Sequence, residues 1–178
     1  MRQQAPTWLH AMKKLLLLLL ISLAAASHAQ VPQIERDALV ALYNSTDGAN
    51  WTDNTGWNGS AGGECDWKGV SCSAGDSPNV IRLFLQSNSL TGTIPAELGN
   101  LTSLTSLSFG NNSLSGSIPA ELGNLTNLTS LSLYNNSLSG SIPAGLGNLT
   151  NVTSLNLYGN SLTGTIPAEL GNMTSLKY

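Results

Sequence analysis

Leucines and polar residues alternate in a pattern that repeats every 24 residues from Val80 to the end of the chain. The second and third units differ at only three of their 24 positions. In the second unit Leu104, Leu107 and Phe109 give the spacing L-x-x-L-x-L, in which the last four positions alternate. This alternation predicts a short strand with Leu107 and Phe109 on one face. The full units are 80–103, 104–127, 128–151 and 152–175, and a fifth begins at residue 176.

One unit of this length has nothing against which to bury its leucines, whereas stacked copies bury them in a continuous column. The repeat therefore predicts a solenoid with one strand per coil, and these strands form a parallel sheet on the concave side. After the strand, Pro119 can open a tight helical turn, and Gly123 can end that turn in a left-handed conformation.

An asparagine recurs just after each predicted strand. Its amide can donate and accept hydrogen bonds with backbone groups of its own and the adjacent coils, which a buried turn would otherwise leave unpaired. We therefore expect a structural ladder, rather than ligand contact, from Asn88, Asn112, Asn136 and Asn160.

The whole unit, L-x-x-L-x-L-x-x-N-x-L-x-G-x-I-P-x-x-L-G-N-L, resembles the leucine-rich repeat in the variant typical of plant extracellular receptors and inhibitors. Bacterial and algal secreted proteins carry the same variant. The resemblance covers residues 80–178 and implies an α/β solenoid, a right-handed leucine-rich-repeat coil with a parallel concave β-sheet. It also implies that residues 30–79 form the N-terminal cap of that family, which is helical and disulfide-bonded.

The predicted cap holds a short helix at residues 34–44 and a C-x6-C motif, Cys65 to Cys72, similar to the paired cysteines of the family. Two cysteines in a secreted chain are most simply one disulfide, and without histidine they rarely complete a metal site. The acidic residues of the cap do not match the calcium-loop pattern, although weak calcium binding stays open. Three tryptophans are expected to cover the apolar end of the first coil, with an aromatic ligand box as the alternative: Trp51, Trp57 and Trp67.

Residues 1–29 read as a secretory signal. Lys13 and Lys14 precede an apolar run of roughly a dozen residues, and small residues stand at −3 and −1 of a cleavage site after Ala29. A membrane anchor is the alternative, but spanning needs about 20 apolar residues. The prediction is a secreted or extracellular protein, in the periplasm or at the cell surface if the source is bacterial.

Charge and histidine content exclude several classes of function. Only 10% of residues are charged, with a net charge of −3, so a basic nucleic-acid binder is not expected. Both histidines lie in the predicted leader, and residues 30–178 keep four basic and ten acidic residues, a net charge of −6. A chain without imidazole lacks the commonest general base. The glutamates at one repeat position, Glu97, Glu121 and Glu169, predict a solvated ridge, so neither an enzyme nor a cofactor is expected.

Function is expected on the concave strand face. If the leucines point inward, the alternate positions point outward, and their tyrosine, serine and asparagine content is typical of adaptable binding surfaces. Four strands offer on the order of 300 Å², below the about 800 Å² of a standard interface. The candidate ligand-binding residues are Arg82, Phe84, Gln86, Ser106, Ser108, Asn111, Ser130, Ser132, Tyr134, Asn135, Ser154, Asn156 and Tyr158.

The favoured function is a secreted binding module that recognises an extracellular protein, peptide or glycan. One alternative is a surface-acting ice-binding or structural cell-surface protein, because Thr105, Thr129 and Thr153 form a regular column. Another is a fragment of a larger receptor-type ectodomain. Since the chain stops inside a fifth repeat, end-to-end self-association is also possible.

Overall fold

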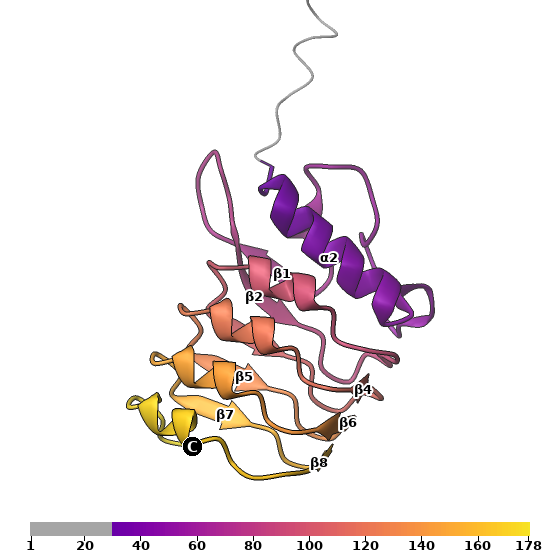
Figure 1. Cartoon of the computed structure of the whole chain (residues 1–178). Coiled ribbons are helices and arrows are strands. Elements are labelled where there is room, and N and C mark those ends of the chain that lie inside the picture. The colour runs from indigo at the N-terminus through magenta and orange to yellow at the C-terminus, as the bar shows by residue number, and fades with distance from the viewer. Residues whose placement is uncertain (1–29) are drawn as a thin grey trace, which may run out of the picture.

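The 24-residue units fold into successive coils that stack on one another beneath an N-terminal helix (Figure 1). A computed structural model describes residues 30–178, and the predicted leader lies outside the described residues. No helix within residues 30–178 is long and apolar enough to cross a membrane. The solenoid predicted from the repeat is confirmed.

A five-stranded sheet, in the order β1-β2-β3-β5-β7, runs along one side of the stack. Strands β2, β3, β5 and β7 pair in parallel. Their register aligns leucines of successive coils, such as Leu83, Leu107 and Leu131, which are all fully buried. Strand β1 pairs antiparallel with β2, an addition that the repeat did not predict. The strands are β1 (Val70–Cys72), β2 (Val80–Phe84), β3 (Ser106–Ser108), β5 (Ser130–Ser132) and β7 (Ser154–Asn156).

A second parallel sheet, in the order β4-β6-β8, follows the first in each coil. Figure 1 shows it along a separate edge of the stack. The sequence pattern did not predict this sheet, because its strands are too short to show alternation. They are β4 (Ser115–Gly116), β6 (Ser137–Gly140) and β8 (Ser161–Leu162).

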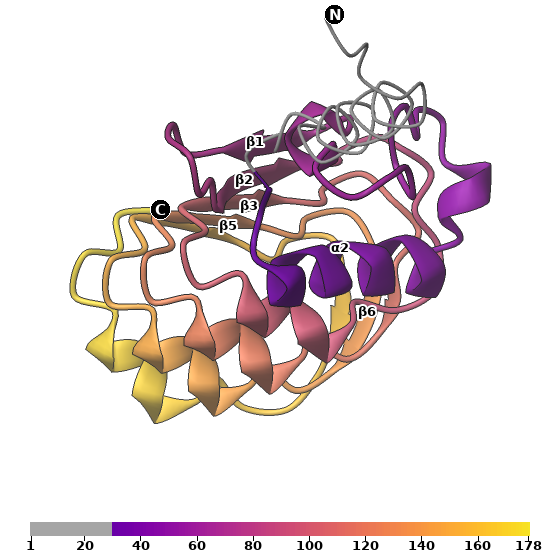
Figure 2. The same cartoon turned by 90° about the horizontal axis from the view of Figure 1, so that it is seen from above.

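Short 3-10 helices form the side opposite the five-stranded sheet, as Figure 2 shows from above. Each begins directly after a proline in extended conformation; Pro119, for example, has φ −64° and ψ 135°. One buried leucine in each of the first three, Leu98, Leu122 and Leu146, fixes the row to the core. The helices are η3 (Ala96–Asn100), η4 (Ala120–Asn124), η5 (Ala144–Asn148) and η6 (Ala168–Asn172).

The prediction that Gly123 ends its turn in a left-handed conformation is wrong. Gly123 lies inside η4 and is not among the residues with positive φ, whereas Gly116 and Gly140, in the second sheet, have φ values of 75° and 76°. Gly123 is needed for a different reason. A Cβ at this position would lie 2.3 Å from the carbonyl oxygen of Gly145 in the next coil, so only glycine allows the two coils to approach this closely.

Gly123→Ala is therefore expected to lower the free energy of unfolding by about 1–3 kcal/mol, the usual cost of overpacking. Gly171 occupies the same repeat position, but a Cβ there meets no atom within 4 Å. Gly171→Ala is the matched control and should leave stability unchanged or slightly raised. Denaturant unfolding of the two variants measures the difference, and equal losses would contradict the close-approach explanation.

The N-terminal cap places helix α2 (Gln33–Ser45) alongside η3 (Figure 2), and it buries Ala38, Leu39 and Leu42. The helix agrees with the predicted span of residues 34–44. Two single-turn helices follow, η1 (Gly48–Asn50) and η2 (Glu64–Asp66).

Aromatic rings fill the interior of the cap. The ring centroids of Trp51 and Trp57 are 4.8 Å apart, and those of Trp57 and Trp67 are 5.0 Å apart. All three tryptophans are at most 7% exposed, and Tyr43 stacks on Trp57. The rings pack against one another, so the cluster is part of the core and offers no open face to an aromatic ligand.

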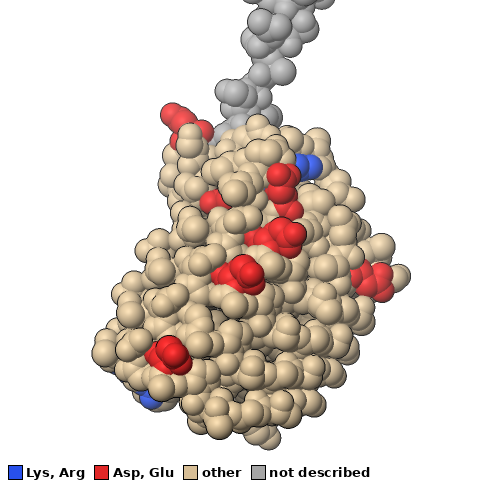
Figure 3. All heavy atoms as spheres, in the orientation of Figure 1, with Lys and Arg blue, Asp and Glu red and all other residues tan. Residues whose placement is uncertain are grey.

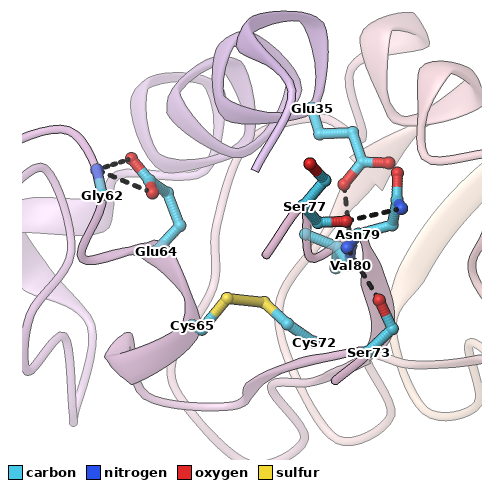
Figure 4. Close-up of a disulfide and its surroundings, with 9 residues drawn as sticks. All are labelled: Glu35, Gly62, Glu64, Cys65, Cys72, Ser73, Ser77, Asn79 and Val80. Atoms are coloured by element: carbon cyan, nitrogen blue, oxygen red, sulfur yellow. Dashed lines mark hydrogen bonds between the residues drawn. A yellow bond between two sulfur atoms is a disulfide. The ribbon is translucent and has the colours of Figure 1, made fainter. Parts of the chain in front are cut away.

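One disulfide and one hydrogen bond stabilise the cap, and Figure 4 shows both. The predicted disulfide between Cys65 and Cys72 is present and joins η2 to the end of β1. Closing this short loop is worth about 2.5 kcal/mol on the loop-entropy relation. Glu35 of α2, only 3% exposed, accepts a 2.7 Å hydrogen bond from the Val80 backbone N–H. Burial raises the pKa of Glu35 above its ordinary value, against the lowering effect of this hydrogen bond.

A partly buried ion pair holds η2 and the loop before it against helix α2. The guanidinium of Arg36 pairs with the Glu64 carboxylate and donates a 2.7 Å hydrogen bond to the Gly59 carbonyl. It also lies 5.4 Å from the ring centroid of Trp67. The Glu64 side chain is 1% exposed and accepts a further 3.0 Å bond from the Gly62 N–H.

Candidate functional site

The exposed positions of the five-stranded sheet form straight columns across the coils, because the parallel register pairs residues 24 apart. We call the solvent side of β2, β3, β5 and β7, with the few residues that follow each strand, the sheet face. It contains all the candidate ligand-binding residues of the sequence analysis. One column is Arg82, Ser106, Ser130 and Ser154, and the next is Phe84, Ser108, Ser132 and Asn156.

The sheet face is almost without charge. Arg82 is the only charged residue on the strands of this sheet. From residue 83 to residue 168 the sequence has two charged residues, Glu97 and Glu121, and both lie on the 3-10 helices of the opposite side. The hydroxyls of five serines on the sheet face make no hydrogen bond to any residue within 30–178: Ser106, Ser108, Ser130, Ser132 and Ser154.

Tyr134 is held in a defined position on this face. Its ring lies over Gly110, where a Cβ would come within 2.1 Å of the ring, so a side chain at residue 110 would displace it. The Asn111 amide donates a 2.9 Å hydrogen bond to the Tyr134 hydroxyl, and the Asn135 amide donates a 2.9 Å bond to the Asn111 side-chain oxygen. Asn111 and Asn135 have φ values of 55° and 50°, a region that asparagine tolerates better than most residues.

Tyr158 has the same repeat position but a different environment. Its neighbour in the preceding coil is Tyr134 rather than a glycine, so it has no flat seat on the backbone. Its side chain is 79% exposed. Phe84, at the other end of the sheet face, is 40% exposed, as the alternation predicted. The sheet face therefore presents one fixed aromatic ring and two that project into solvent.

The recurring asparagines use their amides on backbone groups. The Asn112 side-chain oxygen accepts bonds from the N–H groups of Asn88 and Leu90, both at 3.0 Å, and its nitrogen donates to the carbonyls of Leu85 and Phe109, both at 2.9 Å. Asn136 and Asn160 also bond to the preceding coil. Their side-chain oxygens accept from the N–H groups of Leu114 and Leu138, and their nitrogens donate to the carbonyls of Phe109 and Leu133.

Asn88, in the first coil, bonds instead to the cap. Its side-chain oxygen accepts a 2.7 Å hydrogen bond from the Asp53 N–H, and its nitrogen donates a 3.0 Å bond to the Asp53 carbonyl. The amide of the first coil thus ties the stack to the cap, as the later ones tie coil to coil.

The threonine column does not form an array of free hydroxyls. Thr105, Thr129 and Thr153 each donate a hydrogen bond from their hydroxyl to a backbone carbonyl of the preceding coil, at 2.8, 2.9 and 3.1 Å.

The opposite side carries the acidic residues. Glu97, Glu121 and Glu169 are exposed in the first turns of η3, η4 and η6, while Gly145 takes that position in η5. Figure 3 shows acidic side chains scattered down this face with few basic ones. A shallow groove of about 780 Å³ lies beside them, lined by small and apolar residues such as Gly116 and Ile118. Among residues 30–178, no three histidine, cysteine, aspartate or glutamate side chains gather closely enough to hold a metal ion.

Family models match the coils directly. The model described as a leucine-rich repeat matches residues 79–101 and 103–125, and the model of two leucine-rich-repeat copies matches residues 126–170. The crystal structure of the BIR2 ectodomain from Arabidopsis thaliana is 35% identical, with a TM-score of 0.70 over 83% of this chain and 77% of that one. The chain belongs to the leucine-rich-repeat family. Its repeats are of the plant-type extracellular variant, as the resemblance implied.

Other leucine-rich-repeat relatives are much longer. The crystal structure of PEPR1–AtPEP1 is 33% identical, with a TM-score of 0.74 over 80% of this chain and 20% of that chain. The receptor protein kinase WSS1 of Oryza sativa subsp. japonica is 35% identical over 94 residues, which are 52% of this chain. The chain spans 9% of that kinase and 6% of a second curated relative.

A solved structure with a different activity is also similar. The crystal structure of a plant ice-binding protein is 29% identical, with a TM-score of 0.54 over 81% of this chain and 54% of that chain. The fold alone therefore does not distinguish ligand recognition from ice binding. The choice between these functions depends on the side chains of the site.

Proposed function

We propose that this chain is an extracellular recognition module, and that its sheet face contacts a protein, peptide or glycan ligand. The observation that carries the proposal is the outward display of aromatic rings on a rigid sheet, with Phe84 40% and Tyr158 79% exposed. Aromatic residues contribute a large share of interface energies, and rigid elements present them at low entropic cost. The solved BIR2 ectodomain and the PEPR1–AtPEP1 structure, whose repeats are similar, support an extracellular location and a binding role.

The small sheet face limits the partner. Four strands of this length offer on the order of 300 Å², whereas a standard interface buries about 800 Å² on each partner. A large protein held by this face alone would bind weakly. The surface is better matched to a short peptide or an oligosaccharide.

Ice binding is the less favoured alternative. In the sequence it is supported by the column of Thr105, Thr129 and Thr153, but their hydroxyls are bonded to backbone carbonyls. The sheet face itself is interrupted by Tyr158, which is 79% exposed. An ice-recrystallisation assay that showed strong inhibition at low concentration would reverse this preference.

The test selects ligands and then asks which face they occupy. Peptides are selected against the full chain from a displayed random library, and their affinities are measured for the chain and for Phe84→Ala and Tyr158→Ala. Each substitution is expected to weaken binding about tenfold or more. Glu121→Gln, on the opposite side, is the matched control and should have no effect. Selected peptides that are sensitive to Glu121→Gln but not to the aromatic substitutions would contradict the proposal.

A further inference from the structure

Tyr134 has the properties of a preformed platform. One face of its ring rests on the backbone at Gly110, and the chain of bonds from Asn135 through Asn111 to its hydroxyl fixes its orientation. A ring held in this way loses little freedom when a ligand is placed on it, and this reduces the entropic cost of binding. Neither bond serves the backbone of the coil, unlike those of Asn112 and its equivalents.

The surroundings of this platform are polar and uncharged. The free hydroxyls of Ser108 and Ser132 lie on the neighbouring column. The side-chain oxygen of Asn156 accepts a hydrogen bond from the Tyr158 N–H, so its amide nitrogen is available to donate a hydrogen bond to a ligand. By standard strand spacings, Arg82 is about 16 Å from Tyr134. A ligand seated here meets hydroxyl and amide groups and an aromatic face, but no charge.

This combination matches the chemistry of a neutral sugar. A pyranose ring has an apolar face of C–H groups, which stacks on an aromatic ring, and a rim of hydroxyls that both donate and accept hydrogen bonds. An anionic ligand would find no cation beside Tyr134, and a cationic one would find no carboxylate. A peptide backbone would find few partners, because the backbone groups of the sheet are already paired between coils.

We propose that Tyr134 is the floor of a binding subsite for one ring of a neutral oligosaccharide, and that Tyr158 is its movable wall. The Tyr158 carbonyl accepts a 2.8 Å bond from the Asn135 N–H, which fixes its backbone beside the platform, while its side chain stays 79% exposed. Tyr158 is therefore free to close on a ring that rests on Tyr134. This inference rests on the proposed function and names the ligand class for one part of the sheet face.

The test is saturation-transfer NMR and calorimetry of the full chain with three neutral oligosaccharides: cellohexaose, mannohexaose and maltohexaose. At least one is expected to bind with a Kd of about 1 mM. Tyr158→Ala should weaken it about fivefold, since an aromatic contact of this kind is worth roughly that factor. Asn111→Ala and Tyr134→Phe, which both remove the bond that orients the ring, should weaken it about threefold.

Glu121→Gln is the control. It should leave sugar binding unchanged, because Glu121 is exposed on η4, on the opposite side from the sheet face. Near-UV circular dichroism confirms that each variant is folded, and Tyr158→Ala removes only an exposed side chain.

Three outcomes would overturn the inference: no binding of any neutral hexasaccharide, binding unaffected by Tyr158→Ala and Asn111→Ala, or tighter binding of a charged hexasaccharide such as hexagalacturonate. If selected peptides still depend on Phe84 and Tyr158 in those cases, the sheet face keeps its proposed recognition function and only the sugar subsite is lost. If the peptides are also insensitive, both proposals fail.

Discussion

Arg36→Ala should lower the free energy of unfolding by about 3–5 kcal/mol, because it leaves a buried carboxylate unpaired. The substitution leaves the Glu64 carboxylate, 1% exposed, without its ion-pair partner and with only the Gly62 N–H as a hydrogen-bond donor. It also removes the contact with the Trp67 ring and the bond to the Gly59 carbonyl. Denaturant unfolding followed by tryptophan fluorescence measures the loss directly, since the cap contains Trp51, Trp57 and Trp67.

Two controls separate the buried charge from general damage to the helix. Asp37→Ala changes the next residue of α2, whose carboxylate makes only an exposed bond to Gln33, and should shift stability by less than about 0.5 kcal/mol. The double variant Arg36→Met with Glu64→Leu should recover most of the loss, because it removes both charges and keeps the packing volume. A double variant as unstable as Arg36→Ala would show that the ion pair itself is not the cause.

Asn136→Leu is expected to cost about 3 kcal/mol, because it leaves one backbone N–H of the turn without a partner and removes further bonds to three carbonyls. The N–H is that of Leu114, bonded at 3.0 Å, and the carbonyls are those of Phe109, Leu133 and Tyr134, at 3.0, 3.1 and 3.2 Å; each carbonyl keeps one other hydrogen bond. Leucine has the same number of side-chain heavy atoms as asparagine and the same branching at Cγ, so the substitution leaves no cavity and the loss reports the hydrogen bonds. The measurement is the free energy of unfolding in urea, together with the melting temperature.

Asn124→Leu is the matched control in the same region of the stack. Asn124 is exposed at the end of η4, and its side chain has no hydrogen bond to a residue within 30–178. Its replacement should leave stability within about 0.5 kcal/mol of the parent. An Asn136→Leu variant as stable as this control would rule out a structural role for the asparagine column.

The architecture of the stack could be predicted because one short pattern occurs four times. This pattern indicates both where the strand lies and which of its faces points into the core. Leu107 and Phe109 alternate with serine, and that is enough to set the register of the whole sheet. The disulfide and helix α2 followed from the family resemblance of the cap. The antiparallel strand β1 was not predicted. It has only three residues, Val70–Cys72, which are too few to show an alternating pattern.

Gly123 shows where local reasoning fails. A glycine after a helical turn usually supplies a left-handed residue, and that rule gave the wrong conformation for Gly123. The actual constraint is the carbonyl of Gly145 in the next coil, which no reading of a single unit can reveal. The second sheet was missed on similar grounds, because its strands exist only through pairing between coils.

The candidate site was located by alternation, but its internal organisation was not. The sequence places Gly110, Tyr134 and Tyr158 in one column without distinguishing them. Only the structure shows that the glycine lets the first tyrosine lie flat, while the second has no such seat. The signal was present in the sequence as a small residue followed one repeat later by an aromatic one.

The span of the side-chain bonds has a mechanical consequence. The bonds of Asn112 and Asn136 that cross between coils reach 22 to 27 residues along the chain, so each coil is fastened to its immediate neighbours. Under tension applied at Tyr178, the coils would therefore detach one at a time from that end, while the disulfide-bonded cap holds last. Each released coil would lengthen the chain by about 80 Å, the extended length of one repeat.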